Sequence, residues 1–208
     1  MWTELLKHFF VGFLITFIGV APPGIISLTG LKVAVEKGKK AGIKYAAGVM
    51  IPDIIQAHIA ILGADYILSH PKLLDWLTRA AVFILLIMSY SAYRQAKKGI
   101  RESAVTKFNI RNPFYYGLFI SAINPMAIPF YFIYSSMLKY AGIIRFDQPY
   151  ASVYIAGAVL GAFTLLSIYS IYARKIIGKI AFIARNFYYI LSALFFLLAV
   201  IAFVGMFV

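Results

Sequence analysis

Residues 19–53 read GVAPPGIISLTGLKVAVEKGKKAGIKYAAGVMIPD, and this stretch decides the fold. It starts as an apolar run, is interrupted at Pro22-Pro23-Gly24, passes through a basic loop, and enters a second apolar run. The second run holds one carboxylate, Asp53, where the other residues are mainly apolar. A helix breaker and an acid are both costly inside hydrocarbon. Their closeness in the sequence predicts a binding site within a membrane.

The composition of the whole chain is that of a membrane protein. Of its 208 residues, 62% are hydrophobic and 13% are charged, and the mean hydropathy is +0.86. Soluble domains carry about 25% charged residues. There is no cysteine, so disulfides and thiolate metal sites are excluded, and the three histidines are scattered. We therefore expect no metal site and no cofactor. The apolar runs show no Ser–His or paired-carboxylate arrangement, so we expect no enzyme either.

Six apolar runs are long enough to cross a bilayer, and lipid requires that they do so as helices. They are Phe9–Leu31, Ile43–Leu68, Leu73–Tyr93, Pro113–Leu138, Ala151–Ala173 and Phe187–Phe207. The predicted fold class is therefore an all-α membrane protein with six transmembrane helices. Prolines interrupt the first and fourth of these runs.

Basic residues set the predicted orientation. Most of the 20 Lys and Arg residues lie in three alternate connections, at residues 32–44, 94–111 and 174–185. Cytoplasmic loops of membrane proteins carry an excess of Lys and Arg. The chain is thus predicted to cross the inner (plasma) membrane several times, with both termini on the outer side. This placement explains the net charge of +13 without a nucleic-acid partner, and it lets the basic connections contact anionic membrane lipids.

The two halves of the sequence resemble each other over a short stretch. FFVGFLIT at residues 9–16 aligns with FYYGLFIS at residues 114–121, and a helix break follows in each half. Three helices per half means that the halves enter the membrane from opposite sides, which is typical of secondary transporters. We predict one transporter domain over residues 1–208, built from inverted repeats at about 1–94 and 112–208. A basic cytoplasmic linker at 95–111 joins them.

Asp53 is the first candidate for chemistry. Its helical face is otherwise made of small residues, namely Gly42, Ala46, Ala57 and Ala60. Another helix can approach such a face closely, so Asp53 is predicted to point into the bundle. Acids within membranes commonly bind a proton, an ion or the ammonium group of a substrate. The alternative is a structural acid that is bonded to Gln56 or to backbone freed by a proline.

The helix breaks supply the other candidates for a substrate or ion site. Pro22 and Pro23 free backbone groups, and Gly24 permits a backbone geometry closed to other residues. These groups bind an ion if they line a cavity, and otherwise form a plain kink. Asn124, beside Pro125, offers a donor and an acceptor to a zwitterionic substrate or to a second helix.

Gly157 and Gly161 form a GxxxG pair in the fifth apolar run. Two small residues at this spacing let another helix approach closely. The pair suits a contact inside the chain and a contact between two copies equally well, so the sequence leaves a homodimer open.

The set of motifs resembles the LysE/RhtB family of bacterial amino acid exporters, within the wider lysine-exporter superfamily. The matching stretches occur in order across nearly the whole chain: Pro22-Pro23-Gly24, Gly38 to Gly42, Gly48 with Asp53, and Asn124-Pro125. Two positions depart from the family. Its usual Pro-Gly-Pro reads Pro-Pro-Gly-Ile from Pro22, and Pro52 precedes Asp53 where the family has glycine.

The resemblance implies efflux driven by the proton gradient, with amino acids as the commonest cargo. It predicts a secondary-active exporter of amino acids or related small solutes, with Asp53 exchanging protons. Pro23, Gly24 and Asn124 would hold the carboxylate or ammonium group. A cation or metal-ion transporter of the same superfamily is the alternative, although divalent sites usually collect several carboxylates. A non-transporting membrane scaffold is the third hypothesis, but it has no need of two helix breaks at matched depth.

Overall fold

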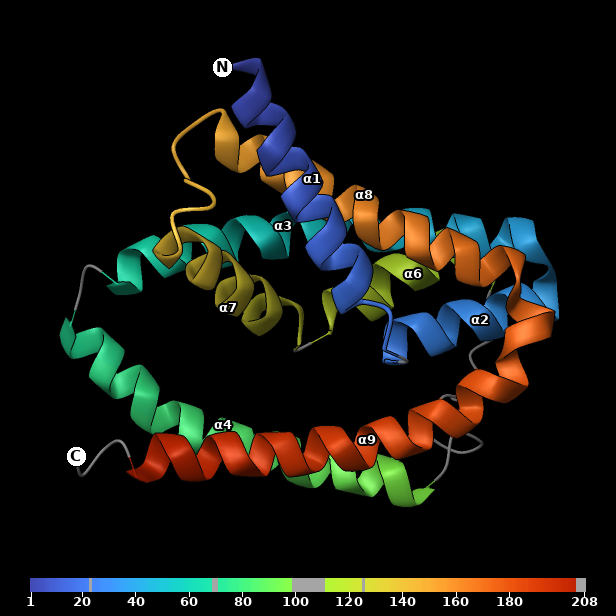
Figure 1. Cartoon of the computed structure of the whole chain (residues 1–208). Helices are drawn as coiled ribbons and strands as arrows, with labels where there is room; N and C mark the ends of the chain where they lie inside the picture. Colours follow the sequence, from blue (N-terminus) through green and yellow to red (C-terminus); the bar gives the residue numbers. More distant parts are fainter. Residues whose placement is uncertain (23, 69–70, 99–110, 125, 205–208) are drawn as a thin grey trace. The chain divides into compact units, whose positions relative to one another are not determined.

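The structure is a computed structural model that describes residues 1–22, 24–68, 71–98, 111–124 and 126–204. These residues are helical apart from short connections (Figure 1). In chain order, the helices are α1 (Trp2–Gly19), α2 (Ile25–Lys37), α3 (Lys39–Leu68), α4 (Pro71–Lys98), α6 (Pro113–Ala122), α7 (Ala127–Tyr140), α8 (Tyr150–Ile171) and α9 (Ala173–Val204). The predicted all-helical class is therefore confirmed for this part of the chain.

The chain divides into two compact units. The first combines Met1–Asp65 with Asn109–Ile177, and the second combines Tyr66–Phe108 with Gly178–Val208. The first unit thus contains α1, α2, α6, α7, α8 and most of α3. The second contains α4 and most of α9, where Ser89 and Ser192 each donate a hydrogen bond to the other's carbonyl oxygen at 2.9 Å. Each unit draws on both halves of the sequence.

Several helices are long and apolar enough to cross a membrane. Within the described ranges they are α1, α3 over Lys39–Gly63, α8, and α9 over Asn186–Val204. The pair α6–α7, bent by 64°, makes a fifth if it is one broken span. A multi-pass membrane protein is therefore supported. The predicted third span lies within α4, which is not among these five, so the count of six stays a prediction.

The first apolar run is interrupted at the predicted place. The helix ends at Gly19, although the N–H groups of Val20 and Ala21 still bond to carbonyls of the last turn, at 2.9 and 3.1 Å. Pro22 follows and has no N–H with which to continue the helix. A new helix, α2, begins at Ile25. The break thus separates two helices rather than bending one.

The prediction of a basic loop after this break is wrong. Residues Ile25–Lys37 are helical, and only Gly38 separates α2 from α3. Lys32 and Glu36 lie one turn apart on α2 with their charged atoms 3.6 Å from each other, a spacing that supports a helix. Gly38 has a φ of +88°, a backbone conformation that glycine adopts without steric cost.

The basic connection expected at residues 174–185 is also helical. It forms the first part of α9, and only Tyr172 separates that helix from α8. Lys and Arg are good helix formers, so their presence marks the side of the membrane without requiring a loop. The third basic connection falls largely on residues 99–110, which lie outside the described ranges.

Glycines bring α8 into backbone contact with α1. A side chain at Gly157 would strike the carbonyl oxygen of Phe9, and one at Gly161 would strike that of Phe13. Both contacts advance in the same direction along the two helices, so α1 and α8 run parallel (Figure 1). The GxxxG pair therefore serves a contact inside the chain, which the sequence had left open.

A second pair of helices, α3 and α6, makes the same kind of contact. Gly48 of α3 approaches the carbonyl oxygen of Phe114, and Gly117 of α6 approaches that of Tyr45. In the first pair, Gly157 approaches Phe9, and Gly12 approaches Tyr154. On each of the four helices, the glycine lies three residues after the aromatic residue of that same helix whose carbonyl oxygen is contacted. The two contacts therefore use the same residue types at the same spacing.

Apolar clusters occupy both ends of α3 in the first unit. One includes Tyr45, Ala46 and Val49 and reaches α2 and α8. The other includes Ala57, Ala60 and Ile61 and reaches α7 and α8. Asp53 lies on α3 between these two clusters.

Candidate functional site

Asp53 is buried in the first unit, with 6% of its surface exposed. The small residues that share its helical face are buried as well, which agrees with the face predicted from the sequence: Gly42, Ala46, Ala57 and Ala60. The hydroxyl of Tyr131 on α7 donates a hydrogen bond to Oδ2 of Asp53 at 3.1 Å. The carboxyl group therefore points into the protein and is held by a phenol from another helix.

Four helices converge on Tyr131, which is 2% exposed. Besides Asp53 of α3, its phenol lies beside Thr16 of α1 and Tyr154 of α8. Within the described part of the chain, no basic side chain forms an ion pair with Asp53. A buried charge without a counter-ion is unfavourable by several kcal/mol. The site therefore favours either a neutral acid or a bound cation.

Gln56 lies one turn beyond Asp53, but the two side chains bond to different helices. Nε2 of Gln56 donates to the carbonyl oxygen of Ser121 on α6 at 3.0 Å. The alternative in which Gln56 holds Asp53 is therefore not what this structure shows. Oε1 of Gln56 and Oγ of Ser121 are buried, and neither has a hydrogen-bond partner among the described residues. A buried polar atom without a hydrogen bond destabilises the fold by about 1–3 kcal/mol. A polar ligand that bonds to these two atoms would remove that penalty.

Asn124 stabilises the turn between α6 and α7. Its backbone N–H donates to the carbonyl oxygen of Ser121 at 3.1 Å, and its Oδ1 accepts from the N–H of Met126 at 3.2 Å. These bonds satisfy backbone groups that the helix break leaves free. In this conformation Asn124 thus hydrogen-bonds the backbone groups at the break between α6 and α7. The neighbouring predicted site residue, Pro125, lies outside the described residues.

The first break is held by a side chain from α8. The hydroxyl of Tyr169 donates to the carbonyl oxygen of Ala21 at 2.6 Å, immediately before Pro22. At the other side of the break, the N–H of Gly24 donates to Oγ of Ser27 at 2.9 Å. One carbonyl freed by the break therefore has a partner within the protein. Pro23 lies outside the described residues.

The expectation that Gly24 uses a backbone geometry closed to other residues is wrong. Its φ of −107° and ψ of −177° are extended backbone, which any residue can adopt. A Cβ added there would meet no heavy atom within 4 Å. Gly24 therefore directly precedes α2 next to open space, and its backbone is not strained.

The predicted site residues fall into two groups. Asp53, Gln56 and Asn124 gather around the second break, through Tyr131 on one side and Ser121 on the other. Pro22 and Gly24 belong to the first break, and no described contact joins them to Asp53. Thr16 of α1, beside Tyr131, is the described link from Asp53 toward the first break.

Sequence reasoning missed Thr16, Ser121 and Tyr131. The first two had a signal, because they end the aligned stretches of the two halves, one turn or so before each break. Tyr131 had none, since it is one of 15 tyrosines and its neighbours come from distant parts of the chain. Together these groups can exchange a proton, accept an ammonium group and hydrogen-bond a polar solute.

A comparison with protein families identifies the family of this chain. The family model described as LysE type translocator matches residues 17–205, from the end of α1 through α9. Comparisons with curated proteins and with solved structures found no match. The members of the matched family are transporters, so the helix breaks and the buried acid belong to a protein that moves a solute. The chain belongs to the LysE type translocator family of membrane transporters.

Proposed function

We propose that this protein exports amino acids or related small solutes across the inner (plasma) membrane, and that proton entry drives the export. Asp53 exchanges the coupling proton. The observation that carries this proposal is the position of its carboxyl group. It is buried in an apolar helix, has no ion pair among the described residues, and bonds to Tyr131 beside a broken helix.

The chemistry of a buried carboxyl group leads to exchange. Its charge is relieved by a proton or by a cation such as the ammonium group of an amino acid. One carboxyl group does not hold both at once, so binding of one displaces the other. When Asp53 is charged, Tyr131 donates to it. When Asp53 is neutral, its own O–H becomes a donor, and Oε1 of Gln56, one turn along α3, is a buried acceptor without a described partner.

The solute's other polar groups require partners as well. Oγ of Ser121 is free of described hydrogen bonds and is fully buried at the second break. In this proposal the Ser121 hydroxyl donates to the solute's carboxylate. The turn at Asn124 and Pro125 opens, so that its backbone groups can bind the solute. Pro22, Pro23 and Gly24 supply the matching backbone groups from the first break.

The proposal includes six spans arranged as two inverted repeats. Support comes from the parallel direction of α1 and α8, which is expected when three spans separate them. The equal spacing of the aromatic and glycine contacts in α1–α8 and α3–α6 supports the same arrangement. Under this topology each half contributes one broken helix to a site near the bilayer centre.

The test measures proton movement in inverted membrane vesicles that carry the protein. A pH gradient is imposed, and a pH-sensitive dye reports its dissipation on addition of each of the twenty common L-amino acids in turn. At least one amino acid should dissipate the gradient. Asp53→Asn should abolish that response, because an amide can neither take up the proton nor attract ammonium.

The matched control is Glu36→Gln, which also converts a carboxylate to an amide. Glu36 is exposed on α2 and pairs with Lys32, so its substitution should leave transport unchanged. Full activity in Asp53→Asn would remove Asp53 from the coupling role. A gradient that no amino acid dissipates, in vesicles shown to contain folded protein, would refute the common amino acids as cargo.

A further inference from the structure

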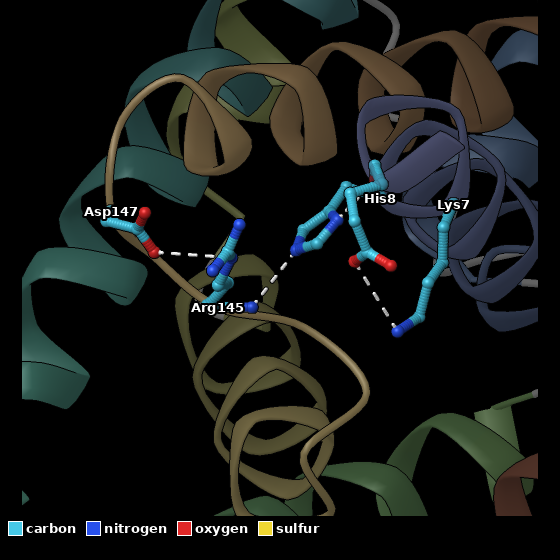
Figure 2. Close-up of polar contacts among 5 residues, drawn as sticks. Lys7, His8, Arg145 and Asp147 are labelled. Carbon is cyan, nitrogen blue, oxygen red and sulfur yellow. Dashed lines mark hydrogen bonds and ion pairs between the residues drawn. The ribbon is translucent and has the colours of Figure 1, made fainter. Parts of the chain in front are cut away.

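His8 lies on α1 away from Asp53, and it is fully buried. Its Nδ1 is 2.7 Å from the carbonyl oxygen of Glu4, and its Nε2 is 3.0 Å from the backbone nitrogen of Arg145 (Figure 2). A carbonyl oxygen only accepts a hydrogen bond, and a backbone N–H only donates one. Nδ1 must therefore carry the proton, and Nε2 must be bare. The two bonds together require a neutral imidazole.

The bond to Nε2 attaches a connection between two helices to α1. Arg145 belongs to the segment that joins α7 to α8, and its neighbour Ile144 is buried in the apolar cluster. The guanidinium of Arg145 lies 4.1 Å from the centre of the Tyr150 ring and 3.8 Å from a carboxylate oxygen of Asp147. The ring of Tyr150 is 4.9 Å from that of His8. The imidazole thus bonds to the backbone of Arg145 (Figure 2), and the imidazole and the guanidinium each lie against the ring of Tyr150.

Protonation of His8 is incompatible with this contact. A proton on Nε2 would face the N–H of Arg145, so that two donors would oppose each other. The imidazolium would also be a buried charge without a described counter-ion, which is costly, whereas the guanidinium of Arg145 is exposed. The bond to Arg145 must therefore break when His8 gains a proton.

The surrounding charges do not relieve that conflict. On α1, Glu4 is 3.7 Å from Lys7, and in the connection Asp147 is 3.8 Å from Arg145, so both nearby carboxylates already have a cation. From α8 the facing group is the phenol of Tyr150. From α7, Lys139 lies over the ring of Phe146 at 5.5 Å and adds a further positive charge.

We propose that His8 is a proton-binding site, and that its protonation detaches the α7–α8 connection from α1. Acidification that protonates the imidazole therefore releases the connection. This device depends on the packing of α1 against the connection. It does not depend on the cargo or on Asp53.

The first test reads the imidazole directly in the purified, full-length protein. The chain has three histidines, so ¹⁵N-histidine labelling gives few nuclear magnetic resonance signals. His8→Gln identifies the His8 signals by their loss. We expect the Nδ1–H tautomer before acidification and the doubly protonated ring after it. The other tautomer before acidification, or a ring that stays neutral while the connection is released, would overturn the proposal.

The second test reads the connection itself. The chain has no cysteine, so Ile143→Cys provides a single site for a nitroxide label beside the buried anchor Ile144. The spin-resonance spectrum should shift reversibly from an immobilised to a mobile component on acidification. The shift should be absent in His8→Gln, because glutamine does not titrate. A shift that persists in His8→Gln would contradict the proposal.

His58 provides a matched control. Its Nδ1 bonds to the carbonyl oxygen of Ile54 at 2.9 Å, the same i to i−4 bond that His8 makes to Glu4. Its Nε2 has no partner among the described residues. His58→Gln should therefore keep the pH-dependent shift of the label. Circular dichroism before and after acidification distinguishes release of the connection from loss of the fold.

Discussion

A phenol and a carboxyl group from helices 78 residues apart in sequence meet at Tyr131 and Asp53. At the scale of single residues, this pair explains how an acid is accommodated among apolar helices. The hydroxyl replaces one of the hydrogen bonds that water would make to the carboxyl group. It leaves the charge itself uncompensated, and this is the property that a proton or cation site needs.

Tyr131→Phe removes that hydrogen bond and keeps the ring. We expect the free energy of unfolding to fall by about 1 kcal/mol, because one buried donor is lost. Transport should fall roughly tenfold if the bond contributes about 1.4 kcal/mol to the charged state that binds the solute. Thermal unfolding in detergent and the vesicle assay measure the two effects.

Tyr134→Phe is the control on the same helix, since Tyr134 is exposed and lies one turn further along α7. It should leave stability and transport unchanged. If Tyr131→Phe also transports at the normal rate, the hydrogen bond to Asp53 has no part in the cycle.

At the scale of helices, the two breaks and the glycine contacts solve different problems. The breaks expose backbone groups, which the protein satisfies with Tyr169 at the first break and with Gln56 and Asn124 at the second. The glycines let α8 approach α1, and α6 approach α3, at backbone distance. Close packing of this kind holds each helix that precedes a break while the break itself stays polar.

Gly48→Ala tests the second of these contacts. The new Cβ would collide with the backbone carbonyl of Phe114, which cannot rotate away as a side chain can. α6 must shift, so we expect a loss of about 1–3 kcal/mol in the free energy of unfolding, as for other overpacked sites. The melting temperature in detergent reports the loss.

Gly63→Ala is the same substitution on the same helix, at a position where a Cβ meets no heavy atom within 4 Å. It should leave stability unchanged or raise it by about 0.5–1 kcal/mol, because alanine suits a helix interior better than glycine. Equal melting temperatures for the two variants would show that α3 and α6 are not in backbone contact.

At the scale of the whole molecule, contacts and charges predict which ends of the helices share a side of the membrane. The contact of His8 with Arg145 brings the start of α1 and the connection α7–α8 together. The charge of the basic turn between α2 and α3 predicts that this turn lies on the cytoplasmic side. The proposed topology therefore places the N-terminus and Tyr140 outside and Lys40 inside.

Single-cysteine labelling tests this topology, since the chain has no cysteine of its own. Thr3→Cys and Tyr140→Cys, both at exposed positions, should react with a membrane-impermeant maleimide in spheroplasts whose plasma membrane is intact. Lys40→Cys should react only after the membrane is permeabilised. Labelling of Tyr140→Cys and Lys40→Cys from the same side would refute the arrangement.

The sequence by itself determined the membrane class, the helical fold, the position of the first break and the candidacy of Asp53. These follow from local physical chemistry: apolar length, the missing N–H of proline, and the cost of an acid in hydrocarbon. The same reasoning misread residues 32–44 and 174–185 as loops, although nearly all of them are helical. Charge indicates the side of the membrane, but it does not end a helix.

Only the tertiary structure decided what each candidate contacts. Asp53 bonds to Tyr131 and Gln56 bonds to the backbone of Ser121, although Asp53 and Gln56 are one turn apart on α3. It also decided that the glycines of α8 pack on α1 and that His8 holds the connection at Arg145. These contacts join residues far apart in the chain. They depend on how the helices pack, which no local pattern encodes.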